Sequence, residues 1–141
     1  PNQFELGYLT GREATCLEST LEAVDVARGM GPSTVLVTSV ERPDRPADTI
    51  EMLVVNDEGA WIVRTPYLPF KRNGSGDVTA ALFTGHYVST GDAADALAKT
   101  ASSVFDLVEN TYRADSRELL LIESQDAYAH PRMQFEVTQV R

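Results

Sequence analysis

The sequence predicts an α/β domain, because stretches with strand character alternate with stretches of helical character along its 141 residues. Residues 34–40 form a β-branched run that is typical of a buried strand. Two further apolar runs, residues 50–55 and 60–64, flank a short turn that ends in Gly59, and this pattern predicts a hairpin. The length of the chain indicates a single domain.

Apolar residues at helical spacing predict four helices around these strands. The predicted helices span residues 3–10, 16–30, 78–90 and 93–108. Gly11 ends the first helix, and Asp92 is a suitable N-cap for the last. In the third helix, Val78, Leu82 and Val88 predict the face that packs inward.

The remaining segments are short. Prolines and charged residues predict an exposed loop at 41–49 and an irregular loop at 65–73. Residues 119–122 are a candidate strand, 126–130 a helical turn, and 135–138 a candidate terminal strand.

The run at residues 34–40 is apolar on both of its faces, so we expect a neighbouring strand on each side of it. The other strand candidates in the sequence are few. This shortage predicts that part of the sheet lies outside this chain.

Composition narrows the classes of partner. A net charge of −9, from 21 acidic and 12 basic residues, disfavours binding to nucleic acid and to anionic lipid. No apolar run approaches the roughly 20 residues that a membrane span needs, and no secretory signal is visible, so we expect a cytoplasmic protein. Cys16 is the only cysteine, which leaves no internal disulfide and no cysteine-based metal site.

One short motif carries chemistry: Asn-Gly-Ser-Gly-Asp at residues 73–77, directly before a predicted helix. The backbone N–H groups of Gly74, Ser75 and Gly76 could form a site for an anion at the helix N-terminus. Asp77, at the head of that helix, could accept a proton from a substrate hydroxyl. The same residues also suit an ordinary turn with an N-cap. A P-loop is not supported, because the motif lacks its Lys-Ser/Thr pair.

Three other polar residues are candidates for contacts with phosphates or metal. Lys71 lies just before the motif and could neutralise ATP phosphates, or it belongs to a solvated loop. Asn2 and Glu5 could orient phosphates and metal-bound water, or they form a capping box, and both descriptions fit one place in space.

A strand end and a loop supply further candidates. Thr38 and Ser39 end the buried strand, at the edge of an α/β sheet where ligands bind, although hydroxyls at a strand end are common. Pro66, Tyr67 and Phe70 could line a slot for adenine, with plain loop packing as the alternative.

Several of these stretches resemble a known family. Residues 66–82 resemble the C-terminal signature of the ribokinase-like kinases, in which a Gly-x-Gly-Asp loop forms the anion hole and its Asp is the general base. Residues 2–5 resemble the superfamily's Asn-x-x-Glu motif, and residues 37–40 resemble the strand end where pyridoxal kinases contact nucleotide phosphates. Residues 118–126, with Pro131 and Phe135, are similar to the closing segment of pyridoxal kinases.

The resemblance implies a fold and an activity. The chain would be the C-terminal portion of a ribokinase-like three-layer α/β/α sandwich, with residues 1–141 as its ATP-binding and catalytic part and the N-terminal half absent. The whole protein would transfer the γ-phosphoryl group of ATP to the 5′-hydroxyl of pyridoxal, pyridoxine or pyridoxamine. Asp77 would be the general base and contact the substrate, and residues 74–76 would form the anion hole. Ser75 replaces the usual threonine of that loop, but the backbone donors remain.

The resemblance also implies ligands and partners. Glu5 would hold Mg²⁺ through water, ATP would be the co-substrate, a monovalent cation such as K⁺ would bind, and the protein would be a homodimer. The residues assigned to ATP are Asn2, Thr38, Ser39, Pro66, Tyr67, Phe70 and Lys71. Two alternatives stay open: a related kinase for another hydroxymethyl substrate, such as hydroxymethylpyrimidine or a sugar, and a non-catalytic fragment that binds nucleotide or assembles with a partner.

Overall fold

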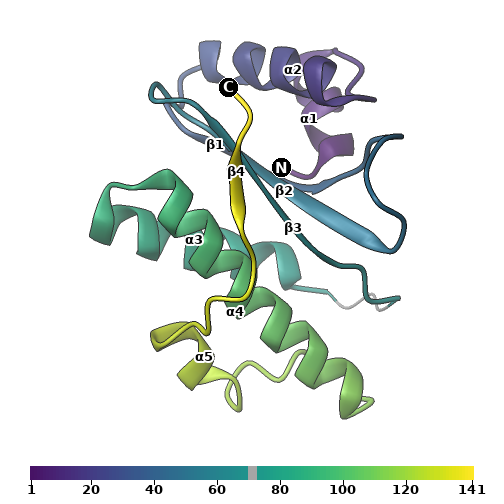
Figure 1. The fold of residues 1–141 in the computed structure, drawn as a ribbon, viewed down its shortest axis with the longest axis vertical. Helices are drawn as coiled ribbons and strands as arrows, with labels where there is room; N and C mark the ends of the chain where they lie inside the picture. Colours follow the sequence, from purple (N-terminus) through teal and green to yellow (C-terminus); the bar gives the residue numbers. More distant parts are fainter. Residues whose placement is uncertain (70–72) are drawn as a thin grey trace.

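The computed structural model describes residues 1–69 and 73–141, and within them the chain forms three layers (Figure 1). The central layer is a sheet of four antiparallel strands in the order β1 (Val35–Val40), β2 (Thr49–Val55), β3 (Ala60–Pro66) and β4 (Val137–Gln139). One face is covered by α1 (Gln3–Thr10) and α2 (Leu17–Gly29), and the other by α3 (Ser75–Thr90) and α4 (Ala93–Arg113). The short α5 (Gln125–Ala129) packs on α4. The α/β prediction is confirmed.

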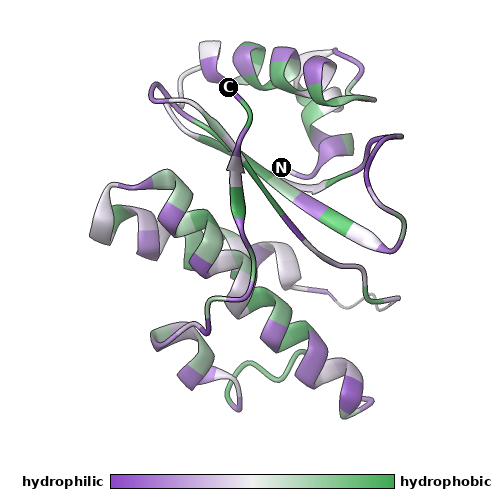
Figure 2. Ribbon diagram, in the orientation of Figure 1, coloured by the Kyte–Doolittle hydropathy of each residue, from purple (hydrophilic) through white to green (hydrophobic). Residues whose placement is uncertain are grey.

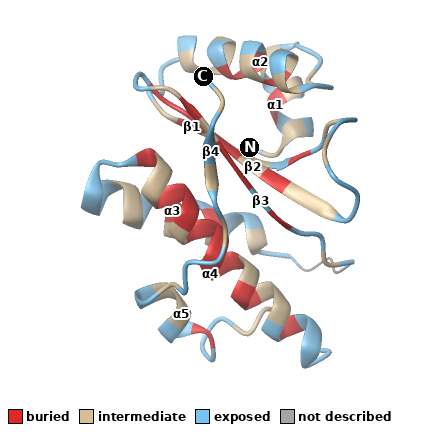
Figure 3. Cartoon of the chain, in the orientation of Figure 1, coloured by how far each residue is buried: buried red, intermediate tan, exposed pale blue. Residues whose placement is uncertain are grey.

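The sheet separates two apolar cores, one under each pair of helices. Alternate residues of β2 point to opposite faces, so that Leu53 and Val55 join the core of α1 and α2 while Val54 joins that of α3 and α4. Figure 3 shows the resulting burial in the central strands and along α4, and Figure 2 shows apolar residues concentrated in the same places. Within the described residues, no helix is both long and apolar enough to cross a membrane.

The predicted hairpin is present as β2 and β3, in an uninterrupted register from Thr49↔Pro66 to Val55↔Ala60. Its turn is closed by Asn56, whose side-chain oxygen accepts hydrogen bonds from the N–H groups of Glu58 (2.8 Å) and Gly59 (3.2 Å). The C-terminal end of the chain lies against this turn, because Ala60 N–H donates to the carbonyl of Arg141 at 2.9 Å.

Strand β1 is at the edge of the sheet, and the start of the chain lies on its outer side. Thr38 N–H donates to the Pro1 carbonyl at 3.0 Å, and Asn2 and Thr38 form an isolated parallel bridge. The first two residues therefore run in the same direction as β1. This arrangement gives the strand a partial neighbour on the side away from β2.

The ends of several elements differ from the predictions. Residues 119–122 are not a strand: 119 and 120 are irregular and 121 and 122 begin a turn. The segment lies beside α4 rather than beside a strand edge, because Leu120 N–H donates to the Thr111 hydroxyl at 3.2 Å. Helix α4 continues to Arg113 because buried Thr111 extends its packed face. The terminal strand begins at Val137, since Phe135 packs instead against Phe105, with ring centroids 5.1 Å apart.

The inward face predicted for α3 is wrong. The helix buries Thr79 and Phe83, whereas Val88 is 80% exposed. The packing of α3 against α4 and the sheet decides which face is buried, and apolar residues on both sides of the helix left the sequence pattern ambiguous.

Gly59 should be far less replaceable than Gly29. A Cβ atom at Gly59 would lie 2.7 Å from the Arg141 carbonyl, and moving that carbonyl would disturb its bond to Ala60 and the ion pair between Arg141 and Asp25. We expect Gly59→Ala to lower the free energy of unfolding by about 2 kcal/mol. Gly29→Ala is the control, because its Cβ would meet nothing within 4 Å. Urea unfolding measures both, and equal effects would contradict this account of the turn.

Candidate functional site

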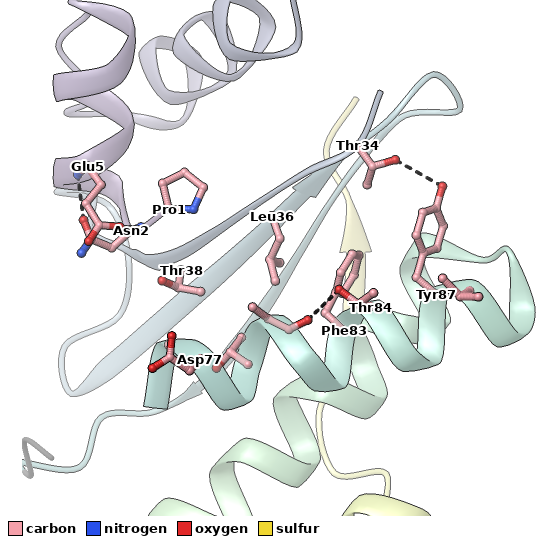
Figure 4. A pocket seen from close by; sticks show the side chains of 14 residues that line it. Pro1, Asn2, Glu5, Thr34, Leu36, Thr38, Asp77, Phe83, Thr84 and Tyr87 are labelled. Carbon is pink, nitrogen blue, oxygen red and sulfur yellow. Dashed lines mark hydrogen bonds between the residues drawn. The ribbon is translucent and has the colours of Figure 1, made fainter. Parts of the chain in front are cut away.

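A groove of about 560 Å³ lies between the edge strand β1, the start of α1 and the first turns of α3 (Figure 4). Its two ends differ in chemistry. The residues of the polar end are Asn2, Glu5, Thr38, Gly76 and Asp77. The other end is lined mainly by the apolar and aromatic side chains Leu36, Phe83, Tyr87 and Val88. The structure thus brings five of the predicted site residues together, although they come from three separate parts of the sequence.

Residues 74–76, predicted to form an anion site, lie at the start of α3. Gly74 precedes the helix in the left-handed conformation (φ 94°) and, being a glycine, provides no side-chain cap. The first N–H groups of a helix, here including those of Gly74, Ser75 and Gly76, have no partner within the helix and can donate to an external acceptor. A helix of 16 residues adds a partial positive charge at this end. Gly76 lines the groove, whereas Gly74 and Ser75 are not among the described lining residues.

Asp77 is exposed, lies in the first turn of α3, and faces the polar end of the groove. Figure 4 shows its carboxylate below Thr38, on the side where Asn2 and Glu5 also lie. The side chain of Asp77 thus lies beside the N–H groups that begin α3, and its role as a base stays a prediction.

Asn2 and Glu5 form the capping box that the sequence offered as one interpretation. The Asn2 side-chain oxygen accepts from Glu5 N–H at 2.8 Å, and Glu5 Oε2 accepts from Asn2 N–H at 2.8 Å. Both residues also line the groove. Their structural role is confirmed, and the groove leaves them in reach of a ligand, so the second interpretation stays a prediction.

Thr38 and Ser39 lie in a β-bulge. Val37 pairs with Leu53 but Val40 pairs with Glu51, so β1 has one more residue than β2 in this interval. Ser39 has a left-handed backbone (φ 53°), which is uncommon for a residue other than glycine. Thr38 lines the groove, whereas Ser39 is exposed and is not among the described lining residues.

A buried carboxylate lies beside this bulge and was missed by the sequence analysis. The Glu51 side chain is fully buried and accepts four hydrogen bonds from Arg42 and Arg64, at 2.7–3.1 Å. Burial raises the pKa of Glu51, but the hydrogen bonds from Arg42 and Arg64 outweigh it, so the pKa lies below its usual value. The predicted hairpin contained a signal for one of these pairs, because its turn places Glu51 opposite Arg64.

Two of the residues predicted to hold adenine, Pro66 and Tyr67, lie outside the groove. Pro66 ends β3, and Tyr67 follows it with 44% of its surface exposed and its N–H bound to the Asp48 carbonyl at 2.8 Å. Neither is among the described residues that line the groove. Phe70 and Lys71 lie outside the described residues. The adenine slot therefore stays a prediction.

The apolar end of the groove contains residues that the sequence analysis did not single out. Phe83 and Tyr87 stack one helical turn apart on α3, with ring centroids 5.6 Å apart. The Tyr87 hydroxyl is within 3.3 Å of the Thr34 hydroxyl and accepts a hydrogen bond from the Asn56 amide at 3.4 Å. The spacing of the two aromatic residues was the available signal. This contact ties α3 to the start of β1 and to the hairpin turn.

The polar side chains of the groove suit a hard metal cation that is also bound by phosphate groups. Glu5, Asp77, Asn2 and Thr38 offer only oxygen and nitrogen atoms, and carboxylate oxygens are the ligands that Mg²⁺ prefers. Among the described residues, no group of three or more His, Cys, Asp or Glu residues could hold a metal alone. Mg²⁺ usually binds through one or two carboxylates, water and substrate phosphates rather than in a cage of protein ligands.

Curated relatives of this chain are pyridoxal kinases. Pyridoxal kinase PdxY of Corynebacterium diphtheriae is 71% identical over 140 residues, which cover 99% of this chain and 50% of that protein. The PdxY protein of Leifsonia xyli is 69% identical with the same coverage. The chain is homologous to pyridoxal kinases over about half of their length. No family model matches it.

Solved structures agree with this assignment of the fold. Pyridoxal kinase from Leishmania donovani, in complex with ADP and pyridoxine, superimposes with a TM-score of 0.86 at 27% identity, covering 100% of this chain and 50% of that one. A phosphomethylpyrimidine kinase described as putative, from Bacteroides thetaiotaomicron, gives a TM-score of 0.85 at 23% identity, covering 99% and 50%. The ribokinase-like fold expected from the sequence is confirmed, and the chain spans about half the length of the relatives that it matches.

Two substitutions of Asn2 should separate its capping role from contact with nucleotide. Asn2→Asp keeps an acceptor at the cap but adds a negative charge beside any bound phosphate, so stability should hold while affinity for ADP falls about tenfold. Asn2→Ala should lower stability by about 1 kcal/mol. Urea unfolding and calorimetric titration of ADP, in the longest polypeptide that contains this chain, measure the two effects. Unchanged ADP affinity in Asn2→Asp would leave Asn2 as a cap alone.

Proposed function

We propose that the protein carrying this chain phosphorylates the 5′-hydroxyl of pyridoxal, pyridoxine or pyridoxamine with ATP. The observation that supports this most strongly is the groove, in which Asp77 and the N-terminus of α3 lie beside Asn2, Glu5 and Thr38. An acceptor of protons next to a row of backbone donors suits a reaction that removes a proton while negative charge accumulates nearby. The identity to pyridoxal kinases along the whole chain supports the choice of substrate.

In this proposal the chemical step is an in-line displacement at the γ-phosphorus. The substrate oxygen forms a bond to phosphorus as the bond from phosphorus to the β,γ-bridging oxygen breaks and ADP leaves. Asp77 accepts the proton of the hydroxyl. The N–H groups of Gly74, Ser75 and Gly76 donate to the oxygens of the transferred group, where the charge of the transition state is concentrated.

The proposed contacts of ATP lie along the groove and in the adjoining loop. Asn2, Thr38 and Ser39 would bind phosphates, and Pro66, Tyr67 and Phe70 would border the adenine. Lys71 would neutralise phosphate charge, which matters in a chain with a net charge of −9. Mg²⁺ would be held by Glu5 through water, and when bound it neutralises the charge of the phosphates. A monovalent cation such as K⁺ belongs to the same proposal.

We also propose that residues 1–141 are the C-terminal part of one ribokinase-like domain. The relatives are about twice as long as this chain. Because Asn2 and Thr38 bridge in parallel, polypeptide preceding Pro1 would continue along the outer edge of β1. There it would cover the apolar end of the groove, where Val88 is 80% exposed. We further propose that the protein is a cytoplasmic homodimer and that it binds neither nucleic acid nor membrane.

A substrate panel tests the activity. The longest polypeptide that contains this chain is incubated with Mg-ATP and, separately, with the three vitamers, with hydroxymethylpyrimidine and with a sugar such as ribose. We expect phosphorylation of the vitamers, measured by mass spectrometry of the product, and no activity from residues 1–141 alone. Turnover of the pyrimidine or the sugar without any vitamer would replace the substrate assignment. Binding of ATP without turnover of any compound would favour a non-catalytic fragment.

Replacing Asp77 tests the mechanism. Asp77→Asn keeps the size of the side chain but removes its basicity. We therefore expect kcat to fall by several orders of magnitude, roughly 10²–10⁴-fold or more, with little change in ATP affinity. Asp92→Asn is the matched control, because Asp92 also begins a helix and asparagine is an equally good cap. Steady-state kinetics on both variants decide. A near-normal kcat in Asp77→Asn would remove this residue from the role of base.

A further inference from the structure

The β-bulge at Thr38 and Ser39 must be held in place by its surroundings. A serine in the left-handed conformation is unfavourable by itself, so the contacts around it have to over-determine it. Up to the bulge the strand alternates regularly, so that Leu36 and Thr38 line the groove while Val35 and Val37 are buried in the core under α1 and α2. The extra residue at the bulge returns Val40 to that same core, and the backbone of Thr38 and Ser39 bends at the polar end of the groove.

The backbone on both sides of Ser39 is tied to the start of α1. Before it, Thr38 N–H donates to the Pro1 carbonyl at 3.0 Å. After it, Glu41 is held by the Gln3 side chain, which accepts from the Glu41 N–H at 2.7 Å and donates to the Glu41 carbonyl at 3.0 Å. These bonds fix the bulge from the side of the groove.

The Arg42–Glu51–Arg64 cluster holds the bulge from the side of β2, across β1 from the start of the chain. Glu51 lies directly across from Val40, the first residue after the bulge, and Arg64 lies across from Glu51 on β3. Arg42 reaches back to Glu51 with two bonds, of 2.8 and 3.1 Å, and its side chain is only 11% exposed. The chain leaving the bulge is therefore fastened to the middle of the sheet.

Stability alone is a weak reason for such a cluster. A buried ion pair adds little stability compared with apolar side chains of similar volume. A network in which every hydrogen-bonding group has a partner instead holds its side chains in a single arrangement. Both carboxylate oxygens of Glu51 are satisfied by guanidinium donors. We propose that Glu51, through Arg42 and Arg64, is a positioning residue that holds the Thr38–Ser39 bulge against the phosphates of the bound nucleotide. This inference rests on the proposed kinase function and names a residue that acts through others rather than touching the ligand.

The test is the nucleotide affinity of Glu51→Gln, in the longest polypeptide that contains this chain. Glutamine lacks the negative charge that binds the guanidinium groups of Arg42 and Arg64, so we expect the loop that follows the bulge to be held less firmly. We expect the KM for ATP and the Kd for ADP to rise about tenfold, while the KM for pyridoxal stays within twofold. Asp106→Asn is the matched control: Asp106 is a buried carboxylate that binds Arg132 and Gln134, remote from the bulge. It should leave both KM values unchanged.

A second substitution distinguishes positioning from general destabilisation. Glycine adopts the left-handed conformation at little cost, so Ser39→Gly should reduce the dependence of the bulge on Glu51. In a double-mutant cycle, Glu51→Gln should then weaken ADP binding less in the Ser39→Gly background than in the wild type. If Glu51→Gln does not fold, Arg42→Lys carries the same test, because lysine keeps the charge but loses the two-pronged contact.

The outcomes separate the two proposals. If Glu51→Gln lowers the unfolding midpoint but leaves ADP affinity within twofold, the positioning role is overturned while the kinase function stands. A wild-type protein that binds ADP without phosphorylating any vitamer would end the proposed function. A weakened ADP affinity in Glu51→Gln would still support the positioning role in that case. A wild-type protein that does not bind ADP would overturn both.

Discussion

The structure depends on the burial of β2 and β3 on both of their faces. A sheet in this position needs apolar cover above and below, and the chain supplies it with α1 and α2 on one side and α3 and α4 on the other. The two pairs of helices approach the sheet from opposite faces and meet at the edge strand β1. There the N-termini of α1 and α3 open on the same groove. The site is thus a consequence of the layering, since its polar residues are distant in the sequence and are joined only at this edge.

Local electrostatics at this edge oppose the charge of the whole chain. The net charge of −9 would repel a nucleotide, and the groove itself contains the carboxylates Glu5 and Asp77. This repulsion is opposed by the N-terminus of α3, whose first N–H groups have no partner within the helix. Glu5 is engaged by Asn2 N–H in the capping box, so part of its charge is already balanced. The proposed binding of phosphates therefore relies on oriented backbone groups and a metal ion more than on side-chain cations.

Features set by local chemistry could be predicted from the sequence, and features set by tertiary packing could not. The cap of α1 and the turn at Asn56 follow from interactions within a few residues, and both were anticipated. The resemblance to kinases assigned a role to Asp77, and the structure places that residue in the groove. The left-handed Ser39 has no local signature, because a serine does not prefer that conformation and only contacts from α1 and β2 impose it. The buried face of α3 was misjudged for the same reason. Apolar residues occupy both sides of this helix, and its packing against α4 and the sheet determines which side is buried.

The three most exposed large apolar side chains among the described residues lie on α1 and α3, the helices that border the groove. Phe4 and Tyr8, one turn apart on α1, are 83% and 86% exposed, and Val88 of α3 is 80% exposed at the apolar end of the groove. Scattered apolar residues are normal on a surface, but large ones beside an edge strand and a groove are costly to leave in water. The parallel bridge between Asn2 and Thr38 gives the direction in which a further strand would extend along β1. The polar end of the groove needs no such cover to bind phosphates, whereas the apolar end acquires a role only when the sheet continues. Under the proposed function, the chain would hold the phosphate-binding side of the site, and the enclosure of a vitamin ring would depend on the half that the relatives contain in addition.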